Sequence, residues 1–91
     1  MDKDIRPCRK ESIAFKRLED KTIIHNPKTK LVILLNKTAS EAWELCDGSR
    51  IISDIEDIFI RKYRAVLKSE IHSDIIEIIG SFEKEGLLKV A

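Results

Sequence analysis

The side chains most able to do chemistry in this chain are two cysteines and two histidines. Cys8 and Cys46 are far apart in sequence, and His25 and His72 stand alone in different segments. Zinc sites are normally marked by closely spaced ligand pairs such as Cys-x-x-Cys, and neither Cys46 with His72 nor Cys8 with His25 has that spacing. A lone cysteine in an apolar pattern is usually a small buried hydrophobe. We therefore expect no metal site.

Carboxylates are the next candidates, because Asp54, Glu56 and Asp57 are close enough in sequence for acid–base chemistry. They fall near the start of an expected helix, where the helix dipole stabilises negative charge, so a solvated helix face is the simpler interpretation. Trp43 has a ring suited to stacking, but it lies on an apolar stripe typical of a core. The chain also lacks a glycine-rich phosphate loop and a recognisable catalytic triad. We expect no enzyme activity and no cofactor.

Length and charge narrow the class of protein. The chain has 91 residues, enough for one small domain. Its 17 basic and 16 acidic residues are interleaved and leave a net charge of +1, which gives no long-range field for nucleic acid or an anionic membrane. No apolar run approaches the roughly 18 residues of a membrane helix, and the start lacks a signal-peptide pattern. We expect a cytoplasmic protein with reduced thiols.

Three strands are expected in the first half of the chain. Residues 1–11 carry seven charges and are expected to form a flexible arm, ordered only where it meets the domain at 12–91. Apolar residues then alternate with polar ones or cluster as β-branched runs, which predicts strands at 12–18, 22–25 and 30–35. Turn residues separate these strands.

Helical spacing replaces the strand pattern after Asn36. Thr38 and Glu41 fit a capping box at the start of a first helix, which Asp47-Gly48 ends. Further apolar stripes predict a second helix over 52–63 and a third that begins at Ser69 and stops at Gly86. Three strands followed by three helices predict an α+β fold in which helices cover one side of a small antiparallel sheet.

The third strand has an unusual composition. All five of its residues are apolar: Leu31, Val32, Ile33, Leu34 and Leu35. Short turns favour a meander, which places this strand at an edge, and edges are normally blunted by charge, proline or a bulge. Two interpretations stay open here: another element covers the strand or it is central, or its edge accepts an added strand from a peptide.

Two rival functions belong to different classes. Basic residues gather around the link between the second and third helices and favour a winged-helix DNA-binding domain: Arg61, Lys62, Arg64 and Lys68. Carboxylates on the third helix would repel phosphates: Glu70, Asp74, Glu77 and Glu83. We therefore expect no nucleic-acid partner. The other rival is a structural homodimer in which two copies of the apolar edge pair with each other.

Two short stretches resemble the signature of a known family. Leu35-Asn36-Lys37-Thr38-Ala39, followed by the run from Ala42 to Gly48, is similar to the PqqD-like family, the peptide-recognition domains of ribosomal peptide modification systems. The match continues at Asp54-Ile55, at Asp74-Ile75 and at Gly86-Leu87-Leu88, and it covers roughly residues 12–90. The chain departs from the pattern at Ile51, where a capping threonine is common.

The resemblance implies a three-stranded sheet packed on three helices in a winged-helix-like arrangement. It also implies binding of the leader segment of a precursor peptide, which adds as a strand beside the third strand and lies against the third helix. Such proteins present the precursor to a modifying enzyme, often a radical S-adenosylmethionine enzyme. The peptide-binding residues that it implies are Leu31, Val32, Ile33, Leu34 and Leu35 on the strand, and Ile71, His72, Ile75, Ile76 and Ile79 on the helix.

Overall fold

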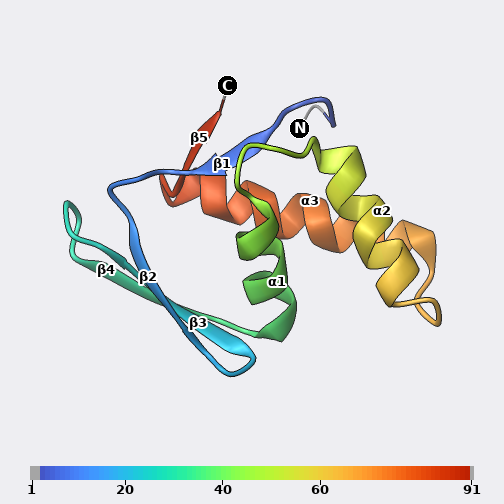
Figure 1. Ribbon diagram of the computed structural model, residues 1–91, viewed down its shortest axis with the longest axis horizontal. Helices are drawn as coiled ribbons and strands as arrows, with labels where there is room; N and C mark the ends of the chain where they lie inside the picture. Colours follow the sequence, from blue (N-terminus) through green and yellow to red (C-terminus); the bar gives the residue numbers. More distant parts are fainter. Residues whose placement is uncertain (1–2, 91) are drawn as a thin grey trace.

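The computed structural model describes residues 3–90, so Met1 and Asp2 of the expected arm and Ala91 of the expected domain lie outside the described residues. Its elements, in chain order, are β1 (Pro7–Arg9), β2 (Ala14–Leu18), β3 (Lys21–Asn26), β4 (Leu31–Leu35), α1 (Lys37–Leu45), α2 (Ile52–Lys62), α3 (Lys68–Lys84) and β5 (Leu88–Val90). In Figure 1 the β2-β3-β4 sheet lies on one flank of the helices, and β1 and β5 lie together near the ends of the chain.

The three-stranded sheet is an antiparallel meander with β3 in the middle, which confirms the predicted α+β fold and places β4 at an edge. A two-residue turn, Glu19-Asp20, joins β2 to β3, and the positive φ of 52° at Glu19 suits the twist of a tight hairpin. A longer turn joins β3 to β4. It closes where Lys30, at φ 65°, donates its backbone N–H to the Asn26 carbonyl at 2.8 Å.

The helix starts differ from those expected. Asn36 caps α1, because its Oδ1 accepts the Ala39 N–H at 2.9 Å, so the predicted capping box of Thr38 and Glu41 is wrong. The third helix begins two residues early, with Leu67 rather than Ser69 at its N-cap. A strong local capping signal was outweighed in α1 by tertiary contacts that engage the Glu41 carboxylate elsewhere.

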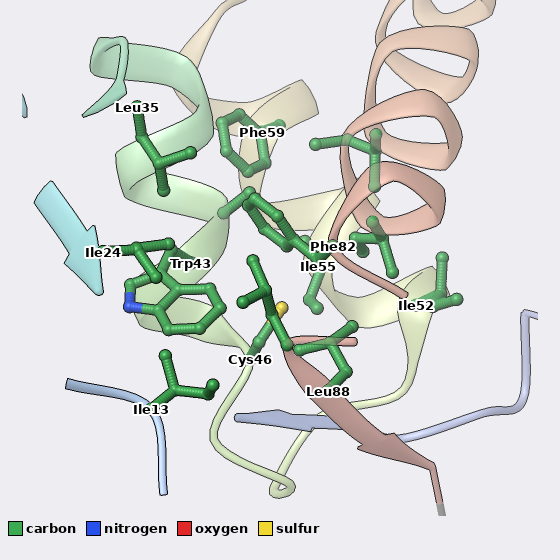
Figure 2. Packing of buried hydrophobic residues seen from close by; sticks show 14 of the residues in the cluster. Ile13, Ile24, Leu35, Trp43, Cys46, Ile52, Ile55, Phe59, Phe82 and Leu88 are labelled. Atoms are coloured by element: carbon green, nitrogen blue, oxygen red, sulfur yellow. The ribbon is translucent and has the colours of Figure 1, made fainter. Parts of the chain in front are cut away.

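One core joins the sheet to all three helices. Its buried apolar members are Ile13, Ile24, Leu35, Ala42, Trp43, Cys46, Ile52, Ile55, Phe59, Ile71, Ile75, Ile79, Phe82, Leu87 and Leu88. Trp43 is fully buried and meets Phe15 and Phe82 edge-to-face, with ring centroids 5.6 and 5.3 Å away. Figure 2 shows side chains from the sheet and the helices converging on this cluster. Trp43 is thus a core residue, as predicted.

Residues 7–9 of the expected arm lie against the domain, where they form β1 and pair antiparallel with β5. Pro7 is buried, and the Arg9 guanidinium donates to the carbonyls of Trp43 and Glu44 at 2.7 and 2.9 Å. A cation at those carbonyls satisfies the acceptors that the end of α1 leaves open. The strand could not be predicted from the local sequence, because the residues that pair with this segment lie at distant positions and the segment itself is densely charged.

Candidate functional site

The register of the sheet determines which backbone groups of β4 face outward. Leu18 and Lys21 close a two-residue turn and form a hydrogen-bonded pair, as such hairpins require. Bonding alternates along β3, so every second residue of β4, beginning with Leu31, directs its N–H and C=O groups at β3. Val32 and Leu34 therefore direct their backbone groups to the free edge, where an added strand would bind them.

Side chains of β4 divide between two faces. Leu31 and Ile33 are half-buried and Leu35 is buried, on the face that packs toward the helices. Val32 and Leu34 lie on the opposite face and are 63% and 60% exposed. The apolar run thus buries one face and leaves the other bare, and its position at the sheet edge excludes the alternative of a central strand.

A hollow of about 300 Å³ adjoins the end of β4, between the start of α1 and one face of α3. Its lining residues are Leu35, Ala39, Asp74, Glu77, Ile78, Ser81 and Phe82. The floor is apolar, while the α3 side carries two carboxylates. Because Leu35 belongs to both β4 and the hollow, a strand added at the free edge would run beside this hollow.

A smaller hollow of about 110 Å³ continues along α3 toward its N-terminus. It is lined by Thr38, Phe59, Tyr63, Val66, Ile71, Asp74 and Ile75. Asp74 lines both hollows, so they lie next to each other along α3, and together we call them the α3 groove.

A hydrogen-bonded group holds α1 against the end of α2 at this groove. The Tyr63 hydroxyl donates to Glu41 Oε2 at 2.6 Å, and Lys62 Nζ donates to Oε1 at 2.7 Å. Burial raises the pKa of Glu41, but these two bonds and the charges of Lys62 and Lys37 outweigh it, so the net pKa is lowered. The bond to Glu41, with burial and the carboxylate charge, raises the pKa of Tyr63 to about 12.

The α3 residues implied by the family resemblance lie mostly elsewhere than on the groove wall. Ile71, Ile75 and Ile79 are buried in the core, and only the first two also reach the smaller hollow. His72 faces α2, with Nδ1 3.1 Å from Glu56 Oε2. Ile76 is half-buried against the core. Neither His72 nor Ile76 lines the α3 groove.

Besides Phe82, the α3 residues that line the hollow beside β4 are four that the sequence analysis did not select as peptide-binding: Asp74, Glu77, Ile78 and Ser81. Their spacing of i, i+3, i+4 and i+7 is itself the signal of one helix face. This face is mostly polar, whereas most of the residues implied by the family resemblance belong to the apolar side of the helix.

The other candidate chemical groups have structural roles. Within residues 3–90, no cluster of three or more potential ligands is placed to hold a metal ion. Both cysteines are free, and burial raises the pKa of the Cys46 thiol to about 12, which keeps it protonated and poorly nucleophilic. Glu56 does not lie on a solvated face as expected. It is buried and accepts a hydrogen bond from Lys3 Nζ at 2.9 Å.

Two remaining observations concern nucleic acid and membranes. Lys62, one of the basic residues that favoured DNA binding, is engaged by Glu41, and the groove face of α3 is acidic. Among the helices of the described part of the chain, none combines the length and hydropathy needed to cross a bilayer.

Comparison with known proteins identifies the family. A family model described as coenzyme PQQ synthesis protein D (PqqD) matches residues 21–88, which is most of the chain. The chain belongs to the PqqD family. The match includes β3, β4 and all three helices, so the elements that form the free edge and the α3 groove are those that the PqqD family shares.

A solved structure has the same fold. It is described as TbiB1 in complex with the TbiA(beta) leader peptide, and it superposes with a TM-score of 0.81 over 90% of this chain and 94% of TbiB1. The two sequences are only 16% identical, so the likeness is one of fold. A search of curated proteins gave no match.

Proposed function

We propose that this PqqD-family chain binds the leader segment of a ribosomally made precursor peptide as a strand added to β4, and presents the precursor to a modifying enzyme. The observation that carries the proposal is the free edge of β4, whose outward backbone groups at Val32 and Leu34 lie beside the α3 groove. Strand addition uses these groups for affinity and the alternate side chains for selectivity.

Fold and family support the same partner. TbiB1, which shares the fold, is described in complex with a leader peptide. In an added strand, every second side chain would point toward the helices, where the floor of the α3 groove offers Leu35, Ala39 and Phe82. Leucine-sized or aromatic side chains at alternate leader positions would fill that floor.

The proposed role is that of an adaptor without catalysis of its own. It would act in the cytoplasm, where ribosomes release the precursor, and the modifying enzyme would be of the radical S-adenosylmethionine class in the simplest extension of the family. A homodimer through paired β4 edges is the competing use of the same backbone groups. It predicts that a bound peptide dissociates the dimer, which sedimentation with and without peptide would detect.

The test is an NMR titration of the full chain with dodecapeptides selected from a random display library. Strand addition predicts the largest amide shifts at Val32 and Leu34, with further shifts at Asp74, Glu77 and Ser81. Shifts confined to the link between α2 and α3 would overturn the proposal. Tighter binding of a fluorescent DNA duplex, with a steep salt dependence, would favour the nucleic-acid function instead.

A further inference from the structure

The wall of the α3 groove carries one sign of charge. Asp74 and Glu77 both line it, Asp74 in both hollows, and no lysine, arginine or histidine is among the lining residues. Both carboxylates are exposed, and neither makes a hydrogen bond or ion pair with another residue of the described range 3–90. Two other helix carboxylates are engaged by lysines, Glu41 by Lys62 and Glu56 by Lys3.

Asp74 and Glu77 lie beside the end of β4, where a side chain of an added strand could reach their carboxylates. Asp74 and Glu77 are one helical turn apart, a rise of about 4.5 Å along α3. Side chains on one face of an added strand are spaced by about 6.6 Å, which is more than the rise between Asp74 and Glu77. Both carboxylates would therefore face one strand position, where a single long cationic side chain can reach them. The neighbouring side chains on that face would then cover the apolar floor at Leu35, Ala39 and Phe82.

From this arrangement we propose that the groove selects a basic leader: an extended segment with a lysine or arginine that faces Asp74 and Glu77, two residues from an apolar side chain. The inference rests on the proposed function, since it names the chemistry of the peptide bound at β4. An acidic residue at the same position would meet two like charges and be rejected. Arginine fits best, because its planar fork can donate to two carboxylates.

The expected size of the preference for a basic side chain follows from the solvent exposure of Asp74 and Glu77. Ion pairs between exposed groups contribute up to about fivefold each in affinity and are screened by salt, with a Debye length of about 8 Å at physiological ionic strength. Two such carboxylates give an expected preference of about tenfold for a basic over a neutral side chain at low salt. The preference should fall as salt is added.

The experiment selects dodecapeptides from an mRNA-display library on the full chain and on three variants. Wild type should enrich lysine and arginine over aspartate and glutamate at one position, and Asp74→Lys combined with Glu77→Lys should reverse that enrichment. Asp74→Asn with Glu77→Gln is a milder change that should abolish the preference and weaken a selected basic peptide about tenfold. Glu83→Lys is the matched control, because Glu83 lies on α3 outside the groove lining and should leave the preference unchanged.

Two outcomes separate the inference from the proposed function. Each selected peptide is retested on Leu34→Pro, which blocks the edge of β4. Peptides that lose binding on Leu34→Pro but show no charge preference would overturn the basic-leader inference and leave strand addition standing. If no selected peptide depends on the β4 edge, both proposals fail.

Discussion

β2 and β4 are the two edge strands of one sheet, and they differ in whether they carry charge that opposes pairing with another strand. β2 carries Lys16 and Arg17, and Arg17 Nη1 pairs with Glu44 Oε1 on α1 at 2.7 Å. β4 carries no charge, and two of its side chains are left bare. Charge inside a strand is a common defence against unwanted pairing. One edge strand thus carries this defence, and the other lacks it.

Neighbouring elements reinforce the contrast. Beside β2, the Arg9 guanidinium lies 5.2 Å from the centroid of the Phe15 ring, and that ring packs on Trp43. Beside β4 lies the α3 groove, with an apolar floor and unpaired carboxylates. An added strand would therefore find side-chain contacts at β4 as well as backbone partners.

The largest expected effect comes from the central strand that supports both edges. Ile24 is fully buried on β3, between the two edges, and Ile24→Ala should lower the free energy of unfolding by about 2–5 kcal/mol through lost burial and a cavity. Urea unfolding followed by circular dichroism measures it. The exposed Val32→Ala is the control and should stay within about 0.5 kcal/mol. Equal effects from the two would mean that β3 is not the common support.

A proline on each edge tests the contrast between the edges directly. Leu34→Pro removes an outward N–H and adds a ring in the path of the incoming strand, so peptide affinity should fall at least about tenfold while helical content is retained. Arg17→Pro is the control matched by register, since Arg17 also directs its N–H away from β3. Proline at Ile33 is unsuitable, because that N–H bonds β4 to β3. Calorimetric titration with a selected peptide that shows equal losses from both prolines would contradict the edge assignment.

The smallest expected effect is on the free energy of unfolding, through the side-chain interactions that hold the helices beside each edge strand. Tyr63→Phe removes the hydroxyl bond to Glu41 and should lower the free energy of unfolding by about 1 kcal/mol near pH 7. The control is Arg17→Ala beside β2, where the ion pair is solvent-exposed and the loss should be under about 0.5 kcal/mol.

The Tyr63 contribution has a defined pH window. Folding raises the pKa of this hydroxyl from 10.0 to about 12, so the stabilisation is complete below pH 10.0 and is lost as pH rises toward 12. The lowered pKa of Glu41 acts at the other end: its contribution is present above the ordinary value of 4.5 and is lost as pH falls through the folded value. Wild type and Tyr63→Phe should converge at both extremes. A stability difference that does not change with pH would mean that the hydroxyl bond is not its source.

Much of the fold was predictable because its signals are local. The strand pattern at Phe15 and the helical stripe through Ile71 and Ile75 each lie within one element, where the structure has β2 and α3, and the turn predicted before β4 is also present. The family motif around Asn36 reinforced them, and asparagine is a residue type that favours helix caps, which is the role of Asn36 in α1.

The site was only partly predictable, because only part of it depends on local sequence signals. The amino-acid sequence by itself determined that Leu31–Leu35 is an apolar strand and that α3 has one apolar face, because period and composition are properties of a single segment. Only the tertiary structure decided that β1 pairs with β5, that Glu41 bonds to Tyr63, and that Asp74 and Glu77 face the end of β4. Those facts depend on how a helix is rotated and which distant segments meet, and packing of the whole core determines both.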